Sequence, residues 1–313
     1  MRAVASAVYE AGWEARRAAY ARGWLRPERV AARVVSIGNL SVGGTGKTTL
    51  TLHLAARARS LGIEHAIVAR DYRPGPAGLG DETLLYRAAC GESRVFSGRS
   101  KRLLAHRAAA SGNRLVLVDD GFSHWRLKRD LDVVLLDARE SLGREHLLPA
   151  GRLREPWRAL QRAGVVVLTR APRDLDVARV VEAARAWAPA AHFAVARHAA
   201  LGIRLGGQSL PSGRRVRVLT ATGNPNAVAE TARELGFEVT ALSTRPDHHW
   251  FTPRDAAAEQ DAAEREGAVL CLTAKDAVRW PLDREAIGVV EVTWQWVSGG
   301  EQAERRVFEA ESS

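Results

Sequence analysis

The sequence predicts an α/β protein with a doubly wound, mainly parallel sheet and a second, smaller α/β domain. Short apolar runs alternate with helical patterns between residue 33 and about residue 200, and a glycine-rich loop follows the first run. Continuous Val, Leu and Ile runs are typical of parallel strands that are covered on both faces. The candidate strands are Val34–Ile37, Ala66–Ala69, Leu115–Val118, Val133–Leu136, Val165–Leu168 and Phe193–Ala196. Ligands of such sheets bind at the carboxyl ends of the strands.

The same alternation resumes on a smaller scale after residue 218. Residues 197–218 carry glycines, a proline and polar residues, which indicates a connection between domains. Beyond it we expect strands at 217–219, 239–242, 269–273 and 289–294, and helices at 226–235 and 255–266. The predicted division is an N-terminal amphipathic, membrane-proximal helix (1–32), a main domain (33–200) and a smaller α/β domain (201–313).

The glycine-rich loop predicts a phosphate-binding site. Four lysines stand against 42 arginines in this chain, and Lys47 is one of the four. It follows a predicted strand and glycines and precedes a predicted helix, which is the context of a P-loop. Backbone N–H groups and the helix N-terminus would bind the anion there. The expected nucleotide-binding residues are Ser41, Val42, Gly43, Gly44, Thr45, Gly46, Lys47, Thr48 and Thr49. The alternative is a glycine-rich turn with a chance Lys-Thr pair.

The overall composition limits the possible partners. A formal net charge of +10 favours an acidic partner such as a nucleotide or an anionic lipid, although a general preference for arginine also explains it. No arginine-aromatic repeat or zinc-knuckle spacing occurs, so we expect no nucleic acid partner. Two cysteines without metal-ligand spacing fit a reducing compartment. No apolar run reaches the ~18 residues of a membrane-spanning helix, and the N-terminus does not resemble a secretory signal.

The first 26 residues form a predicted helix with aromatic residues on one face. Tyr9, Trp13, Tyr20 and Trp24 recur at helical spacing, with arginines nearby. Such a helix can lie in the membrane interface, with its aromatic residues at headgroup depth. Packing against the main domain is the equally weighted alternative. The interfacial alternative predicts peripheral contact with an anionic membrane.

Acidic residues follow the third candidate strand. Residues 115–118 are apolar, and Asp119, Asp120 and His124 come after them. An apolar strand that ends in carboxylates is typical of the Walker B arrangement, which holds Mg²⁺ beside a P-loop. An exposed turn at the strand end is the alternative.

Three further segments carry residues that suit acid–base chemistry. Asp81 and Glu82 follow a glycine- and proline-rich loop, where a carboxylate can act as a general base or a metal ligand, or merely begin a helix. His248 stands beside Asp247, which suits proton transfer, although a surface histidine pair is also possible. Residues 273–276 contain Lys275, another of the four lysines. The alternative is that this segment only caps a solvated helix. Arg70, at the end of the second strand, is expected to meet a phosphate.

Taken together, seven segments resemble the motifs of the tetraacyldisaccharide 4′-kinase family, in the family's order and over most of the chain. They are residues 37–48, 80–82, 119–124, 147–156, 223–225, 247–248 and 273–276. Residues 147–156 (Leu-Leu-Pro-Ala-Gly-Arg-Leu-Arg-Glu-Pro) match almost residue for residue. The family normally has Ser or Thr where Ser41 replaces the first P-loop glycine. Asp71, Ser123 and Ala274 depart from the family pattern, and the N-terminal region is less apolar than usual.

The resemblance implies a lipid kinase of the P-loop NTPase fold that uses ATP and Mg²⁺. It would phosphorylate the 4′-hydroxyl of a tetraacylated disaccharide 1-phosphate, giving lipid IVA, at the cytoplasmic face of the inner membrane. Asp81, His248 and Lys47 would be catalytic. Thr48, Asp119, Asp120 and Glu155 would hold the metal. The expected substrate contacts are Arg70, Tyr72, Glu82, Arg102, His124 and Arg154. No obligate protein partner is evident.

A regulatory P-loop NTPase, of the switch or partitioning type, is the alternative function. A GTPase should carry an Asn/Thr-Lys-x-Asp motif after the fifth strand, where this chain has Thr169 and Arg170. A partitioning-type loop has lysine just before Gly-Gly, where this chain has Val42. A non-enzymatic lipid-surface protein, the third possibility, leaves the set of motifs unexplained.

Overall fold

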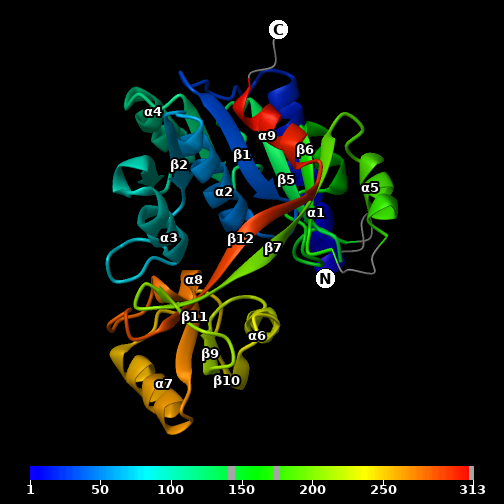
Figure 1. Cartoon of the computed structure of the whole chain (residues 1–313). Helices are drawn as coiled ribbons and strands as arrows, with labels where there is room; N and C mark the ends of the chain where they lie inside the picture. Colours follow the sequence, from blue (N-terminus) through cyan, green and yellow to red (C-terminus); the bar gives the residue numbers. More distant parts are fainter. Residues whose placement is uncertain (140–144, 172–175, 310–313) are drawn as a thin grey trace. The chain divides into compact units, whose positions relative to one another are not determined.

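The chain divides into two units in the structure, a computed structural model that describes residues 1–139, 145–171 and 176–309 (Figure 1). Unit 1 contains residues 1–70, 90–197 and 294–313, and unit 2 contains residues 71–89 and 198–293. This division differs from the predicted boundaries in two places. Residues 71–89 group with the second unit, and the C-terminal residues from 294 onward group with the first.

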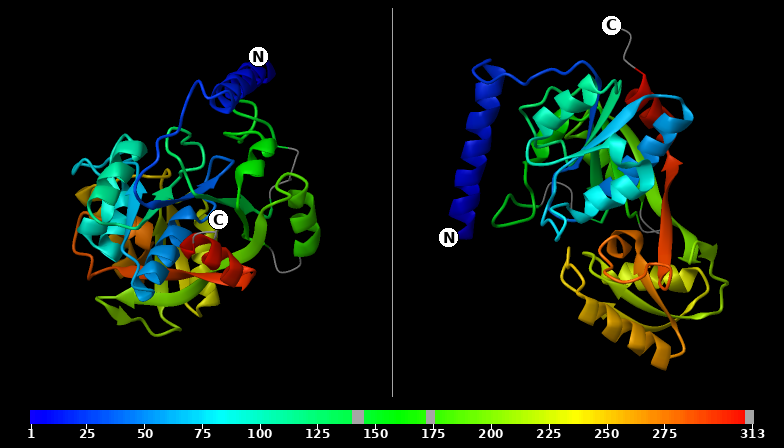
Figure 2. Two further views of the ribbon diagram at one scale, coloured as in Figure 1. Left: turned by 90° about the horizontal axis from the view of Figure 1, so that it is seen from above. Right: turned by 90° about the vertical axis from the view of Figure 1, so that its left-hand side faces the viewer.

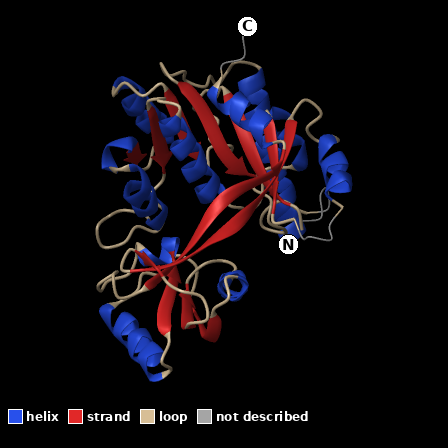
Figure 3. Ribbon diagram, viewed as in Figure 1, coloured by secondary structure: helices blue, strands red, loops and turns tan. Residues whose placement is uncertain are grey.

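Unit 1 contains a parallel sheet with strand order β3-β2-β4-β1-β5-β6-β7. Its strands are β1 (Arg33–Asn39), β2 (His65–Ala69), β3 (Val95–Ser97), β4 (Leu115–Asp119), β5 (Leu131–Asp137), β6 (Val165–Thr169) and the first part of β7 (His192–Leu205). Helices and strands largely alternate along the chain, and Figure 3 distinguishes the helices, in blue, from the strands, in red. The helices are α1 (Arg2–Ala21), α2 (Lys47–Ser60), α4 (Lys101–Ala110), α5 (Val177–Arg185), α9 (Gly300–Phe308) and the 3₁₀ turns η1 (Glu92–Arg94) and η2 (Trp157–Arg162). This is the predicted doubly wound, mainly parallel architecture.

Unit 2 contains four parallel strands in the order β10-β9-β11-β12. They are β9 (Arg215–Thr220), β10 (Glu238–Thr244), β11 (Val269–Thr273) and β12 (Gly288–Ser298), and β8 (Gln208–Ser209) pairs with β7 as an antiparallel hairpin. The helices are α3 (Asp81–Cys90), α6 (Pro225–Glu234), α7 (Pro253–Arg265) and α8 (Ala274–Ala277). Thr252 and Asp255 form a capping box that begins α7, because each side chain accepts a bond from the other's backbone.

The expected connection at 197–218 is only partly irregular. Strand β7 continues through residue 205 and returns through β8, so the segment that reads as a linker is largely strand. The central strands are buried along almost their whole length, whereas β7 is mostly exposed or half-buried after Ala196, and Gly202 interrupts it. These features explain why the sequence alone indicates a loop there. Strands β7 and β12 each continue from one unit into the other.

Candidate active site

The predicted phosphate-binding loop lies where β1 leaves the sheet. Gly43 and Gly46 have φ angles of 124° and 94°, a backbone region that favours glycine. Helix α2 begins at Lys47, so its N-terminus faces the loop. The Lys47 ammonium donates a hydrogen bond to Asn39 Oδ1 at 3.0 Å. Strand, loop and helix therefore occur in the order that an anion site requires.

Asp119 is the last residue of β4, the direct neighbour of β1, and Asp120 follows it. The parallel register pairs Asp119 with Ile37, so both strands release their loops at the same edge of the sheet. Asp120 has a φ of 47°, an uncommon value for a residue other than glycine. Uncommon backbone angles of this kind cluster at functional sites. The predicted pair of carboxylates thus stands beside the P-loop.

Arg154 joins these two segments. Its guanidinium donates two hydrogen bonds to the Asp120 carboxylate, at 2.7 and 2.6 Å, and also contacts Asn39 Oδ1. Burial would raise the pKa of Asp120, but the hydrogen bonds from Arg154 and the charge of Lys47 hold it well below its usual range. Asp120 is therefore ionised at neutral pH, as a cation ligand must be.

Lys101 is a functional candidate that sequence reasoning missed. Its ammonium is buried and donates to the backbone carbonyls of Asp119 and Asp120, at 2.5 and 2.7 Å. These bonds hold the chain where β4 ends and Asp120 adopts its uncommon conformation. The scarcity of lysine was the signal available, since Lys101 is another of the four in the chain.

A second constellation forms within unit 2 around Asp81, the first residue of α3. His248 Nδ1 lies 2.8 Å from Asp81 Oδ2, and the ammonium of Lys275 and the guanidinium of Arg279 lie 3.7 and 3.6 Å from the same oxygen. Asp81 itself is only 2% exposed. Burial would raise its pKa, but the hydrogen bond with His248 and the charges of Lys275 and Arg279 lower it. The structure thus brings together three segments that the sequence marked separately.

The loop before Asp81 is attached to the segment that carries His248. Trp250 Nε1 donates to the Arg73 carbonyl at 3.0 Å, and its ring packs so closely on Gly75 that a Cβ there would lie 2.4 Å from it. The Tyr72 ring contacts the His248 ring edge-on, with centroids 5.2 Å apart. These contacts support the positive φ of His248, 64°.

Asp71, a departure from the family pattern, closes the base of this loop. Its Oδ1 accepts hydrogen bonds from the Gly80 backbone N–H at 3.1 Å and from the Thr83 hydroxyl at 2.8 Å. Both donors flank Asp81. Asp71 therefore braces the start of α3, a stabilising contact that a glycine would not supply.

Comparison with known proteins identifies the family. A family model described as tetraacyldisaccharide-1-P 4′-kinase matches residues 2–310. The chain is 37% identical over 302 residues to a tetraacyldisaccharide 4′-kinase of Anaeromyxobacter sp. (strain Fw109-5), covering 88% of this chain and 81% of that protein. The chain belongs to the tetraacyldisaccharide 4′-kinase family.

Two further comparisons agree with this assignment. The chain is 36% identical over 288 residues to the enzyme of that name from Chromobacterium violaceum, covering 85% of this chain and 79% of that one. A crystal structure of LpxK from Aquifex aeolicus in complex with ATP superposes with a TM-score of 0.73 at 22% identity, over 97% of this chain and 96% of the other. The latter likeness confirms the predicted α/β fold.

The structure of this kinase-family chain argues against one predicted metal ligand. Both carboxylate oxygens of Glu155 are engaged: Trp125 donates to one at 3.2 Å, and Trp13 and Arg162 donate to the other at 3.1 and 2.6 Å. The carboxylate is buried and pairs with a cation that lies over aromatic rings. Glu155 is therefore a packing and anchoring residue in this kinase-family chain.

Arg102 is likewise engaged in a contact unlike the predicted one. Its guanidinium forms an ion pair with the exposed carboxylate of Glu28, at 2.5 and 2.6 Å. The neighbouring Lys101 points to the strand end instead. One position along α4 rotates a side chain by about 100°, so the sequence alone did not distinguish the two cations.

The other expected substrate contacts occupy different surroundings. Arg70 is exposed at the end of β2, and Tyr72 is half-exposed beside His248. Glu82 Oε1 lies 3.7 Å from the Lys275 ammonium. Burial, with the charges of Lys101 and Arg129, lowers the pKa of His124 to about 4, so its ring is neutral at pH 7. Their contact with substrate stays a prediction.

Helix α1 packs against the rest of unit 1 through most of its aromatic face. Trp13 is buried, the Tyr9 hydroxyl donates to the Arg154 carbonyl at 2.8 Å, and Tyr20 lies against Trp125 with centroids 5.4 Å apart. The left-hand view of Figure 2 shows the helix, in dark blue, beside the green segment that it contacts. These contacts with protein groups match the packed alternative for Trp13 and Tyr20, whereas Tyr9 is still 40% exposed, and contact with lipid stays a prediction. Trp24 remains 74% exposed.

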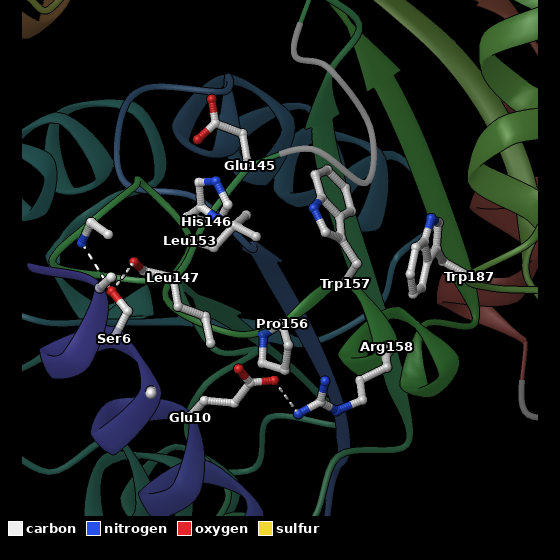
Figure 4. A pocket seen from close by; sticks show the side chains of 13 residues that line it. Ser6, Glu10, Glu145, His146, Leu147, Leu153, Pro156, Trp157, Arg158 and Trp187 are labelled. Atoms are coloured by element: carbon white, nitrogen blue, oxygen red, sulfur yellow. Dashed lines mark hydrogen bonds and ion pairs between the residues drawn. The ribbon is translucent and has the colours of Figure 1, made fainter.

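A cavity of about 420 Å³ lies between α1 and the segment around residues 145–158 (Figure 4). The Ser6 hydroxyl donates to the Leu147 carbonyl at one side, and Glu10 pairs with Arg158 at another. Most of the lining is apolar: Ala3, Ala7, Leu147, Ala150, Leu153, Pro156, Trp157 and Trp187. The cavity therefore suits an apolar group with a polar neighbour.

Two features are absent from the described residues. No helix in residues 1–139, 145–171 or 176–309 is long and apolar enough to cross a membrane. Within the same ranges, no three or more His, Cys, Asp or Glu side chains gather as a metal cluster. A P-loop kinase needs no such cluster, because phosphate oxygens and water complete the shell of its Mg²⁺.

Proposed function

We propose that this chain transfers the γ-phosphate of ATP to the 4′-hydroxyl of a tetraacylated glucosamine disaccharide 1-phosphate, giving lipid IVA. The observation that carries the proposal is the buried Asp81–His248 pair, 2.8 Å apart, in a chain that also has a P-loop. A nucleotide switch needs only water as its acceptor. A kinase must orient and deprotonate a hydroxyl group, and a carboxylate beside an imidazole suits that task.

The residues of unit 1 would bind the nucleotide. Lys47 and the backbone N–H groups of loop 41–46 would neutralise the β- and γ-phosphates. Arg154, which pairs with Asp120 in this structure, would also be available to the phosphates. These groups would stabilise the negative charge that develops on the transferring phosphoryl group. Preorganised dipoles and charges accelerate a reaction most when they act on such developing charge.

Hard oxygen donors beside the P-loop fit Mg²⁺. The Thr48 hydroxyl and the carboxylates of Asp119 and Asp120 would hold the ion, directly or through water. Asp120 fits best, because its pKa lies well below the usual range and it stays ionised. When bound, the ion would supply positive charge that offsets the negative charge of the phosphates.

The residues of unit 2 would act on the acceptor. Asp81 would orient the 4′-hydroxyl and take its proton, and His248, its hydrogen-bond partner, would hold the carboxylate in position. The hydroxyl oxygen forms the new P–O bond while the bond from the γ-phosphorus to the bridging oxygen breaks, and ADP leaves. Glu82 and Tyr72 stand beside this pair and would contact the sugar.

The substrate's acyl chains and the membrane would meet the surface near α1. Val4 and Val8 are each 68% exposed on this helix, one turn apart, and Trp24 stands near its end. We assign the apolar cavity beside α1 to part of an acyl chain. The protein would then bind peripherally at the cytoplasmic face of the inner membrane, through apolar side chains and arginines together.

A direct assay tests the proposed function. Purified protein should transfer ³²P from γ-labelled ATP to tetraacyldisaccharide 1-phosphate in detergent or mixed vesicles, and NMR of the product should place the new phosphate at the 4′ position. ATP consumption without a labelled lipid would favour the regulatory alternative instead.

A further inference from the structure

We propose that Arg279 is a positioning residue for Asp81, which it fixes through a buried chain of alternating charges. The chain runs from the Asp276 carboxylate through the Arg279 guanidinium to Asp81 and His248. All four residues belong to unit 2. The inference rests on the proposed function, because it concerns the carboxylate to which that function assigns the acceptor proton.

One end of the chain is anchored at the carboxyl ends of two strands. Asp276 is fully buried and accepts hydrogen bonds from the Thr220 hydroxyl at 2.8 Å, the Ala221 N–H at 3.1 Å and the Thr273 hydroxyl at 2.7 Å. The same carboxylate accepts a short hydrogen bond from Arg279 Nη2. Thr273 and Asp276 thus do more than cap α8: they fix a cation.

The other face of Arg279 points at Asp81. Nη1 lies 3.6 Å from Asp81 Oδ2, and the guanidinium side chain has no exposed surface. Neither Nη1 nor Nε has a hydrogen-bond partner among the described residues. A buried cation with unused donors is destabilising unless a nearby anion offsets it. Asp81 is that anion, so Arg279 and Asp81 restrain each other.

Lys275 also faces the Asp81 carboxylate, but from a more exposed position than Arg279. Its ammonium lies 3.7 Å from Asp81 Oδ2 and also 3.7 Å from Glu82 Oε1, so it is shared between two carboxylates. Its side chain is 22% exposed, so solvent and salt screen its charge more than that of Arg279. Among the described residues, His248, Lys275 and Arg279 are the groups that pair with the Asp81 carboxylate. Lys275→Met therefore removes a second cation from the same oxygen, and its effect is measured beside that of Arg279→Met.

The positioning role predicts a specific change in pH dependence. Removing the Arg279 charge leaves Asp81 easier to protonate, because an opposite charge at this distance favours the carboxylate. We expect Arg279→Met to move the acidic limb of the kcat/KM profile upward by about one pH unit. The kcat should fall while the KM for ATP stays near that of the wild type. Arg279→Lys should retain the wild-type limb, and Lys275→Met should shift it in the same direction, because its ammonium lies at a similar distance from the same oxygen.

A second measurement does not require activity. The Asp81 carboxyl carbon, labelled with ¹³C and assigned by its loss in Asp81→Asn, should titrate at higher pH in Arg279→Met than in the wild type. Arg279→Gln serves if the methionine variant does not fold, which thermal unfolding will show. An Asp81 titration that is identical in the charge-removed variant and the wild type would overturn the inference. A clear NMR shift without lipid phosphorylation would instead contradict the proposed function alone.

Discussion

At the scale of single residues, neighbouring cations in α4 differ in what they contact. Lys101 is 7% exposed and donates to the two backbone carbonyls that end β4, whereas Arg102 pairs with Glu28 at the surface. The expected phosphate contact was Arg102. Buried hydrogen bonds to a charged group contribute more to stability than exposed ion pairs do. Lys101, rather than Arg102, is therefore the cation of α4 that contacts the candidate site.

We predict that Lys101→Met lowers the free energy of unfolding by about 1–3 kcal/mol, because two carbonyls lose a charged donor. It should also weaken Mg²⁺-dependent nucleotide binding, since Asp120 loses the contact that fixes its backbone. Arg102→Met is the matched control and should change stability by less than about 1 kcal/mol. Urea unfolding and fluorescent-nucleotide titration measure both quantities. Equal effects of the two substitutions would contradict the distinction.

Lys47 gives a prediction about the reaction itself. Lys47→Ala should leave the protein folded and lower kcat/KM by about 10²–10³-fold, because one preorganised charge at the phosphoryl group is lost. Lys128→Ala, which removes an exposed lysine outside both constellations, provides the control. Steady-state transfer rates and circular dichroism decide the matter. A folded Lys47→Ala variant with wild-type turnover would show that loop 41–49 is no P-loop.

Local sequence patterns predicted which residues belong to the candidate site better than they predicted which groups those residues contact. The P-loop follows from a strand, glycines and a lysine in close sequence, so nearby residues suffice to predict it. Glu155 shows the limit, because its motif suggested a metal ligand while its partners Trp13 and Trp125 are 142 and 30 residues away. Such partners depend on tertiary packing, which single-sequence periodicity does not contain.

At the scale of elements, α1 has two different faces. One face is fixed to unit 1 by Trp13 and Tyr9, and the other exposes Val4 and Val8. The sequence left interfacial and packed arrangements equally weighted. Neither arrangement alone describes this helix, because an amphipathic helix can bury one stripe of side chains in protein and still expose apolar side chains on another face.

Trp13 tests the packed face of α1. Trp13→Phe keeps an aromatic ring but replaces the larger indole and removes the N–H that donates to Glu155 at 3.1 Å, so we expect the free energy of unfolding to fall by about 1–3 kcal/mol. Trp24→Phe changes an exposed ring and should alter stability by less than about 0.5 kcal/mol. Denaturant unfolding of both variants measures the difference. No loss in Trp13→Phe would mean that Arg162 and Trp125 alone satisfy Glu155.

The central strands were the most predictable elements. Five predicted strands of unit 1 lie within β1, β2, β4, β5 and β6, because continuous apolar runs bounded by turn residues leave few alternatives. Strand β3 has three residues, too few for a period to show. The continuation of β7 to Leu205 was also missed, since glycine and polar residues in it resemble a loop.

At the scale of the whole molecule, the two units are not contiguous in sequence. Residues 71–89 leave the P-loop unit to join unit 2, and residues 294–313 return to unit 1. Within unit 1, Glu304 of α9 accepts from Trp296 at 2.8 Å and lies 2.7 Å from His53 on α2. Pairings over such sequence separations carry no local signal, which is why the sequence did not predict that residues 71–89 join unit 2 and that residues 294–313 return to unit 1.

The proposed membrane attachment would depend on the whole chain, because its net charge is +10. We expect co-sedimentation with anionic vesicles to weaken as salt rises, because exposed charges are screened over about 10 Å at 0.1 M. Val4→Asp with Val8→Asp should reduce binding at both low and high salt. Leu103→Asp, at another exposed apolar position of unit 1, should not. Equal binding by all variants would place the membrane contact elsewhere.

The central claim is that ATP is spent on a lipid hydroxyl, with Asp81 serving the acceptor. The most direct measurement is therefore the ratio of phosphate transferred to lipid to ATP consumed, in the wild type and in Asp81→Ala. We predict a ratio near one for the wild type and a large loss of transfer in Asp81→Ala, with ATP affinity retained. ATP consumption that is independent of the lipid, or an Asp81→Ala variant that transfers phosphate at the wild-type rate, would contradict the account.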